Sequence, residues 1–223
     1  DPRVGLPLDH LHSYKWAGLS SEGFSQVFDK DGNIISYNDP REFEIDDLAY
    51  SGRLEPNVYG GFINTFTYKG FSLSTTLTYK LGYKFQKSSS LGYINYSNSV
   101  PNFVSKEFEN RWRAPGDENT TNVPILSDDS GDLTTNNTNF YSNGSQNVLD
   151  ASHIRFKQLS LLYNLPKSFI NKLPINSLQI GFQARDLGVK VFNDEGIDPE
   201  DNSYNAFNIP IDPEYTFSIN VNF

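Results

Sequence analysis

Apolar and polar residues alternate strictly over several stretches of this chain. Positions 215–223 place five apolar side chains on one face and four small, uncharged polar side chains on the other. Positions 71–81, with one interruption at Thr75, and positions 177–185 follow the same rule. A period of two residues is typical of a β-strand whose two faces meet different surroundings. The pattern predicts strands over these three ranges.

Three further strands are predicted with less regular patterns. In 153–164 the alternation slips near Lys157 and then resumes, as at a β-bulge. Positions 61–69 lead through Lys69-Gly70 into the strand that begins at Phe71, which indicates a tight hairpin. The earliest strand is expected at 13–18. The total is about six strands of the length that crosses an outer membrane. No amphipathic helix is expected beyond one turn over 167–172.

The lengths of the connections alternate. Those at 69–70 and 165–176 are short, whereas those at 20–56, 83–151 and 188–213 are long and rich in Asn, Asp, Ser, Gly and Pro. A transmembrane barrel combines short periplasmic turns with long outer loops. The predicted fold class is therefore all-β: a transmembrane antiparallel β-barrel with long extracellular loops, in which Phe223 lies at the periplasmic end.

Aromatic residues gather near the predicted strand ends, as they do in the two girdles of a membrane barrel. Those expected at the periplasmic ends are Tyr68, Phe71, Tyr163 and Phe223, and those expected near the outer ends are Tyr14, Trp16, Tyr79 and Tyr215.

Composition narrows the function classes. The net charge of −9 and the pI near 4.8 disfavour nucleic acid as a partner. Cysteine is absent, which excludes disulfides and cysteine chemistry, and no apolar run is long enough for a transmembrane helix. A chain that starts at Asp1 without methionine is expected to be a processed or partial product. A secreted carbohydrate-binding β-sandwich shares this composition, but the alternating loop lengths disfavour it.

Candidate chemistry is sparse. Asp29 to Asn33 resembles the opening of a calcium loop, but Ile34 stands where Gly is needed, so a polar turn is favoured. His10 and His12 alternate on one strand face without a third metal ligand. The remaining cluster is acidic and is interpreted as a solvated loop, with a bound cation or contact with a covering protein as the alternatives: Asp194, Glu195, Asp198, Glu200 and Asp201. No catalytic residue, metal or cofactor is expected, and the chain is predicted not to be an enzyme.

Two other groups of residues are candidates for a functional role. Polar side chains on the predicted strands are expected to face a lumen: Lys80, Gln179, Gln183, Arg185, Asn220 and Asn222. Aromatic side chains in the long loops are expected either to contact a substrate or a protein that covers the loops, or to fix the loop itself: Tyr93, Tyr96, Trp112 and Tyr141.

Short motifs run in order along the whole chain. They are Gly5-Leu6-Pro7-Leu8 with Tyr14 to Leu19, Tyr59-Gly60-Gly61-Phe62 with Tyr68-Lys69-Gly70-Phe71, Arg111-Trp112 with Pro115-Gly116-Asp117, Ser152 to Leu161, Ala184-Arg185-Asp186-Leu187, Asp198-Pro199-Glu200 and the last Phe. Together they resemble the SusC/RagA branch of TonB-dependent receptors of the bacterial outer membrane. Asp186 stands where that family more often shows Asn.

The resemblance implies that residues 1–223 are the C-terminal segment, the last six or so strands, of a barrel of about 22 strands. Phe223 would be its barrel-assembly C-terminus, and the plug and earlier strands would precede Asp1. The implied partners are the remainder of the barrel, the lipid bilayer, a SusD-like surface lipoprotein that closes the outside as a lid, and TonB. The implied function is import of large nutrients, either oligosaccharides or oligopeptides. A structural scaffold in a larger outer-membrane complex is the alternative.

Overall fold

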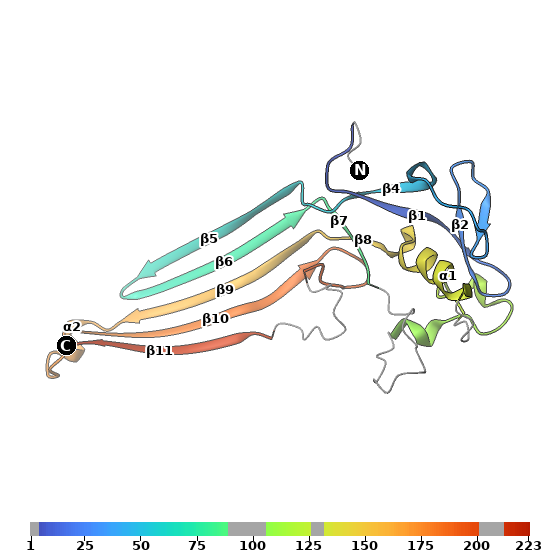
Figure 1. Cartoon of the computed structure of the whole chain (residues 1–223). Helices are drawn as coiled ribbons and strands as arrows, with labels where there is room; N and C mark the ends of the chain where they lie inside the picture. Colours follow the sequence, from blue (N-terminus) through green and yellow to red (C-terminus); the bar gives the residue numbers. More distant parts are fainter. Residues whose placement is uncertain (1–4, 89–105, 126–131, 201–211) are drawn as a thin grey trace. The chain divides into compact units, whose positions relative to one another are not determined.

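The computed structural model of the chain describes residues 5–88, 106–125, 132–200 and 212–223 (Figure 1). The described residues are mostly β-sheet with two short α-helices. They group into two compact units. The first unit holds residues 5–55 and the described part of 84–150, and the second holds 56–83, 151–200 and 212–223. Among these residues, no helix is both long enough and apolar enough to cross a membrane.

The second unit is one antiparallel sheet of five long strands. Its spatial order, β11-β10-β9-β6-β5, follows the order of the strands along the chain (Figure 1). The strands are β5 (Val58–Tyr68), β6 (Phe71–Leu81), β9 (His153–Asn164), β10 (Ser177–Val191) and β11 (Glu214–Asn222). Each strand pairs with the next one in sequence, so the connections alternate between the two ends of the sheet.

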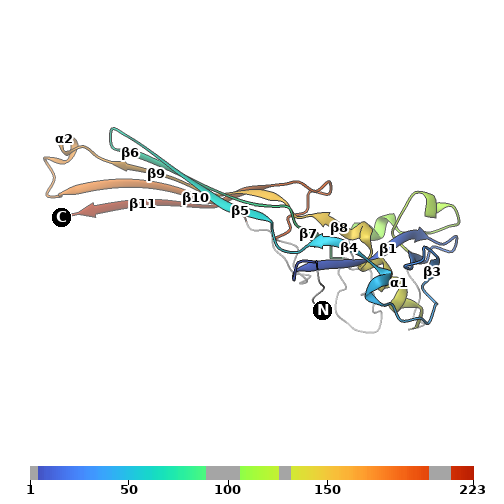
Figure 2. The ribbon, with the colours of Figure 1, turned by 90° about the horizontal axis from the view of Figure 1, so that it is seen from above.

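The short connections lie together at one end, which we call the hairpin end. At the β5–β6 turn, Lys69 has φ 44° and Gly70 has φ 88°, the conformation of a two-residue turn that favours the twist of paired strands. The other short connection carries α2 (Lys167–Ile170) and lies at the same end (Figures 1 and 2). Both predicted short connections, the hairpin and the single helical turn are confirmed.

A bulge interrupts the register of β9 at the position where the sequence pattern slips. Thr76 pairs with Gln158 and Leu77 with Phe156, so Lys157 is an extra residue on β9. On the other side, β10 also shifts register between Arg185 and Gly188. Within this shift Asp186 has φ 49°, and its carboxylate lies 3.4 Å from the Lys157 ammonium group. Asp tolerates this left-handed conformation better than most residues. The predicted bulge is confirmed.

The first unit consists of short elements. A four-stranded sheet has the order β3-β2-β1-β4, and β7 pairs with β8. The strands are β1 (His10–Leu19), β2 (Ser25–Phe28), β3 (Ile34–Ser36), β4 (Leu48–Arg53), β7 (Lys84–Gln86) and β8 (Val148–Asp150), and the helix is α1 (Asp132–Ser142). Four 3₁₀ turns complete it: Ile45–Asp47, Lys106–Asn110, Asp117–Asn119 and Ser145–Asn147.

The core of the first unit forms where α1 meets the small sheet. Val27, Ile35 and Phe140 are buried there, and Tyr14 and Trp16 pack against them. Polar groups support this contact, since the Asn137 side chain accepts a hydrogen bond from the Ser25 backbone N–H at 2.7 Å. Because α1 and the small sheet share this core, the segments 20–56 and 83–151 do not remain open loops.

The structure corrects three expectations. The strand predicted at 13–18 is β1, which belongs to the small sheet and not to the long one. Tyr14 and Trp16 therefore pack in the first unit and are not part of a girdle. The segments 20–56 and 83–151, expected as plain loops, contain short strands and α1. The helix was missed because its middle, residues 134–139, consists only of Thr and Asn, which have low helix propensity.

Candidate functional site

The polar face of the five-stranded sheet carries all six strand candidates. Gln179 pairs with Asn164 on one side and Asn220 on the other, which places these three side chains on one face. They form a polar ladder, in which the Gln179 amide donates to Asn164 at 2.9 Å and the Asn220 amide donates to Gln179 at 3.2 Å. The same register puts the others on this face: Lys80, Gln183, Arg185 and Asn222. That this face lines a lumen stays a prediction.

The opposite face is apolar and open. Its large side chains are between 45% and 78% exposed: Phe62, Phe66, Tyr68, Phe71, Tyr215, Phe217 and Ile219. Two apolar residues of β5, Tyr59 and Ile63, are exposed on the polar face instead. A monomer in water rarely exposes a continuous apolar surface of this extent. The face therefore requires an apolar environment.

Both outer strands of the sheet have a free edge among the described residues. In this part of the chain β5 pairs only with β6, and β11 pairs only with β10. Unpaired N–H and C=O groups along a long strand are templates for further strand pairing. The sheet has the properties of a section of a larger one.

A cluster of charged residues occupies the polar face at the end opposite the hairpin end. Arg155, on β9, is 8% exposed. Its Nη2 contacts both carboxylate oxygens of Asp198, at 2.8 and 2.7 Å, and lies 2.9 Å from Glu200. The ammonium group of Lys80 contacts Glu200 at 2.7 Å, and Nε2 of the buried His153 lies 3.6 Å from it. We call Lys80, His153, Arg155, Asp198 and Glu200 the strand-end cluster.

The environment of Glu200 favours its ionised form. Partial burial acts to raise the pKa of Glu200, but the hydrogen bond from Lys80 and the nearby charge of Arg155 outweigh it and lower the pKa. The interpretation of residues 194–201 as a solvated loop is therefore wrong for Asp198 and Glu200, which pair with side chains of the strands. Asp194 and Glu195 are exposed, and Asp201 lies outside the described residues.

The aromatic loop candidates that can be placed are buried. Trp112 is 7% exposed, and its indole covers Gly23, where a Cβ would clash with the ring. Tyr141 is 2% exposed and donates a hydrogen bond to Glu107 at 3.2 Å. Neither ring offers a face to a solute, so the alternative that they fix the loop is favoured. Tyr93 and Tyr96 lie outside the described residues.

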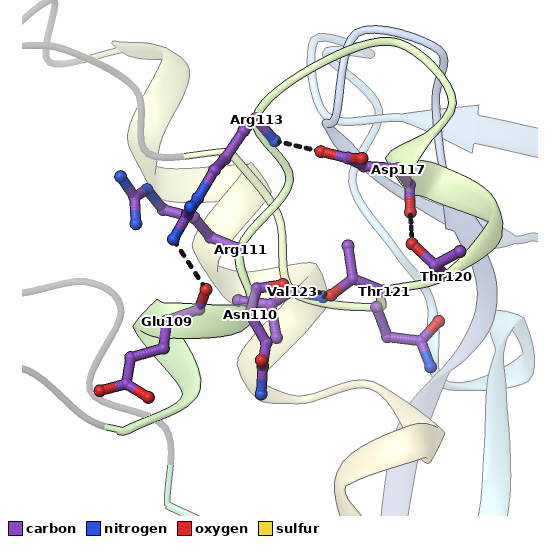
Figure 3. Close-up of a pocket in the computed structure, with 9 residues that line it drawn as sticks. Glu109, Asn110, Arg111, Arg113, Asp117, Thr120, Thr121 and Val123 are labelled. Carbon is purple, nitrogen blue, oxygen red and sulfur yellow. Dashed lines mark hydrogen bonds between the residues drawn. The ribbon is translucent and has the colours of Figure 1, made fainter.

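The loop that contains Trp112 lines an open pocket of about 700 Å³ (Figure 3). Charged residues of both signs line it, among them Arg113 and Asp117. Most of its polar groups hold the loop itself. Asp117 accepts hydrogen bonds from the backbone N–H groups of Arg113 and Ala114 at 3.0 and 3.1 Å, and Thr121 donates to the Asn110 carbonyl at 2.6 Å. The pocket has balanced charge and no group directed at a particular ligand class.

The calcium-like segment is a structural turn. Oδ1 of Asp29 accepts backbone N–H groups of Asp31 and Asn33 at 2.9 and 2.8 Å, and Oδ2 accepts the Asn33 amide and the Arg41 guanidinium, both at 3.1 Å. Both oxygens thus face hydrogen-bond donors and a cation, which is incompatible with a metal ion. The polar-turn interpretation is confirmed. Within the described ranges, no group of three or more His, Asp or Glu residues is arranged to bind a metal.

The strand-end cluster is the feature that the sequence did not reveal. In the sequence, Arg155 and His153 belong only to the motif from Ser152 to Leu161. The one available sign was that Lys80 and Arg155 are charged positions on a face that is otherwise largely neutral. Their partners are 120 and 43 residues away in sequence, so no local spacing connects them.

Comparisons with known proteins give a likeness in structure only. No family model matches the chain, and no curated protein matches it in sequence. The solved RagAB peptide importer in its 'open-open' state matches all of this chain with a TM-score of 0.64 and 20% identity, over 25% of its own chain. In fold, the chain resembles part of a RagAB chain. The RagAB 'closed-closed' state matches 93% of this chain (TM-score 0.60, 23% identity), and a further RagAB peptide transporter structure matches 81% (TM-score 0.57, 21% identity).

The chain spans about a quarter or less of the RagAB chains it matches, with coverage of 25%, 22% and 19% of their lengths. At these identities the likeness to RagAB concerns the fold.

We predict that Asp29 stabilises the first unit in a pH-dependent way. Its hydrogen bonds to Asn33 lower its pKa, against the effect of burial, from 3.8 to about 2. Because the folded-state pKa lies below the unfolded one, the stabilisation is complete above about pH 4 and is lost as the pH falls toward 2. The melting temperature of the Asp29→Asn variant should lie below wild type at neutral pH, and the gap should close toward pH 2.

The Asp31→Asn variant is the matched control, since Asp31 is an exposed carboxylate of the same turn. It should melt like wild type across this pH range. Equal effects of the two substitutions at neutral pH would contradict the role assigned to Asp29.

Proposed function

We propose that this chain is a section of the barrel wall of a TonB-dependent outer-membrane importer of large nutrients. The observation that carries the proposal is the five-stranded sheet, which is open along both edges and has one polar and one exposed apolar face. In a bilayer every backbone polar group must be paired, so a spanning sheet has to close into a barrel. Further strands would complete the edges at β5 and β11, and the resemblance to SusC/RagA proteins implies about 22 strands in all.

The two faces then have distinct environments. The apolar face, with Phe66, Phe217 and Ile219, would contact lipid, and the face with Gln179, Gln183 and Asn220 would line an aqueous lumen. Aromatic residues at the hairpin end support the assignment of the apolar face to lipid, since Phe71 stacks on Tyr163 with 4.1 Å between ring centroids. Such rings are favoured at a membrane interface. Because the short connections lie at the hairpin end, that end would be the periplasmic one.

Import is the function that this architecture supports best. The structures that share the fold are importers of peptides, and the motifs resemble a family that works with a SusD-like lipoprotein and with TonB. We therefore propose the same kind of partners, with an oligopeptide or an oligosaccharide as the solute. In the strand-end cluster, the charges of Lys80 and Arg155 are paired with those of Asp198 and Glu200. No covalent chemistry is assigned to the chain.

The import proposal is tested by purifying the tagged protein from its native membrane in detergent. The expected complex contains a plug domain continuous with the barrel, a surface lipoprotein and a bound peptide or glycan that mass spectrometry identifies. A barrel that lacks a plug and carries no solute would support the scaffold alternative. A protein that stays soluble without detergent would contradict the barrel itself.

Two neighbouring residues of β11 give a matched test of the lipid-facing side. The Ile219→Arg variant should reduce assembly into the outer membrane, because an arginine facing lipid near the midplane costs about 2–4 kcal/mol. The Asn220→Arg variant places the same side chain on the opposite face and should assemble like wild type. The fraction of protein that migrates as a folded barrel on unheated gels measures both. Equal assembly of the two variants would contradict the proposed orientation.

A further inference from the structure

The chain folds back on itself immediately after β10. The backbone N–H of Phe192 donates to the carbonyl of Ser152, the residue before β9, at 3.0 Å. The Asn193 side chain then closes a tight turn, accepting from the N–H of Ile197 at 2.9 Å and donating to its carbonyl at 2.7 Å. This turn directs Asp198 and Glu200 toward the polar face of β9.

The strands present a complementary group of side chains at this place. Lys80 is paired directly with His153, and Thr78 with Arg155, so Lys80, His153 and Arg155 lie side by side on one face. Arg155 binds both Asp198 and Glu200, and Lys80 binds Glu200, at distances between 2.7 and 2.9 Å. The Glu200 N–H also donates to Asp198 at 3.0 Å, which fixes the two carboxylates relative to each other.

Burial makes this contact more than a surface ion pair. Exposed pairs between flexible side chains contribute little and are weakened by salt. Here Arg155 is 8% exposed and binds two carboxylates, so loss of these partners leaves a poorly hydrated charge on Arg155. The Arg155 side chain therefore has few other positions in which its charge would be paired.

We propose that residues 192–200 form a strap, which Lys80, His153 and Arg155 hold across the polar face of the sheet. The strap attaches the start of the β10–β11 connection to β9, which is the neighbour of β10 on the side away from β11. It also supplies internal counter-ions, so that Lys80 and Arg155 do not present free positive charge. On the proposed function, the strap lies on the lumen side, where Asp198 and Glu200 balance the charges of Lys80 and Arg155.

The strap is tested by a spin label on a cysteine at position 194, in the full-length protein with any other cysteine replaced by serine. Asp194 is exposed and this chain has no cysteine of its own. The wild-type label should show restricted backbone motion. The Arg155→Ala variant should convert the spectrum to a mobile component. The Arg185→Ala variant, which removes an exposed arginine from the same face, should leave it unchanged.

Two further variants make the result decisive. Asp198→Asn removes a charge from the strap without altering a strand, and it should mobilise the label even where Arg155→Ala prevents folding. Lys80→Glu should mobilise the label as well, because it places a carboxylate beside Glu200 in place of the ammonium group that binds it. A label that stays restricted in folded Asp198→Asn protein would overturn the strap. The measurement does not depend on transport, so the strap can hold where the import proposal fails, and the reverse.

Discussion

A β-strand assigns each side chain to one of two faces, and this alternation governs the larger unit of the molecule. Over β11 the assignment is complete, with Tyr215, Phe217, Ile219 and Val221 on one face and only polar residues on the other. A shift of one residue in pairing would exchange the two faces. The register of the five strands therefore has to be maintained over their whole length for the sheet to keep one apolar surface.

Two local features maintain that register. At the hairpin end, the Lys69-Gly70 turn sets Tyr68 opposite Phe71. A Cβ at Gly70 would lie 2.7 Å from the Asn164 carbonyl, so the turn also depends on glycine for its packing against β9. Further along, the bulge at Lys157 adds one residue to β9. Beyond it, as far as Arg155, apolar residues of β9 stay on the apolar face of the sheet and polar residues on the polar face. The strand-end cluster depends on this correction, because it places Arg155 on the same face as Lys80.

The sequence predicted what depends on neighbours along the chain and missed what depends on distant ones. The long strands, the hairpin and the bulge were predicted because their patterns are local. The sheet to which β1 belongs was not predicted, because the alternation in β1 resembles that of a barrel strand. Its partners, β2 and β4, are short and irregular. The polar face could be predicted residue by residue, but the pairing of Arg155 with Asp198 joins positions 43 residues apart. Trp112 was a candidate for ligand contact because a buried and an exposed tryptophan look the same in sequence.

The central claim is that lipid covers one face of the sheet and water the other, and accessibility along β11 tests it most directly. Single spin labels at positions 215–222 of the full-length protein in a bilayer would be compared for collisions with oxygen, which concentrates in lipid, and with a water-soluble nickel chelate. We predict that accessibility alternates with a period of two, with oxygen favoured at Phe217 and Ile219 and nickel favoured at Ser218 and Asn220. Equal accessibility to nickel on both faces would contradict the account and indicate a sheet surrounded by water.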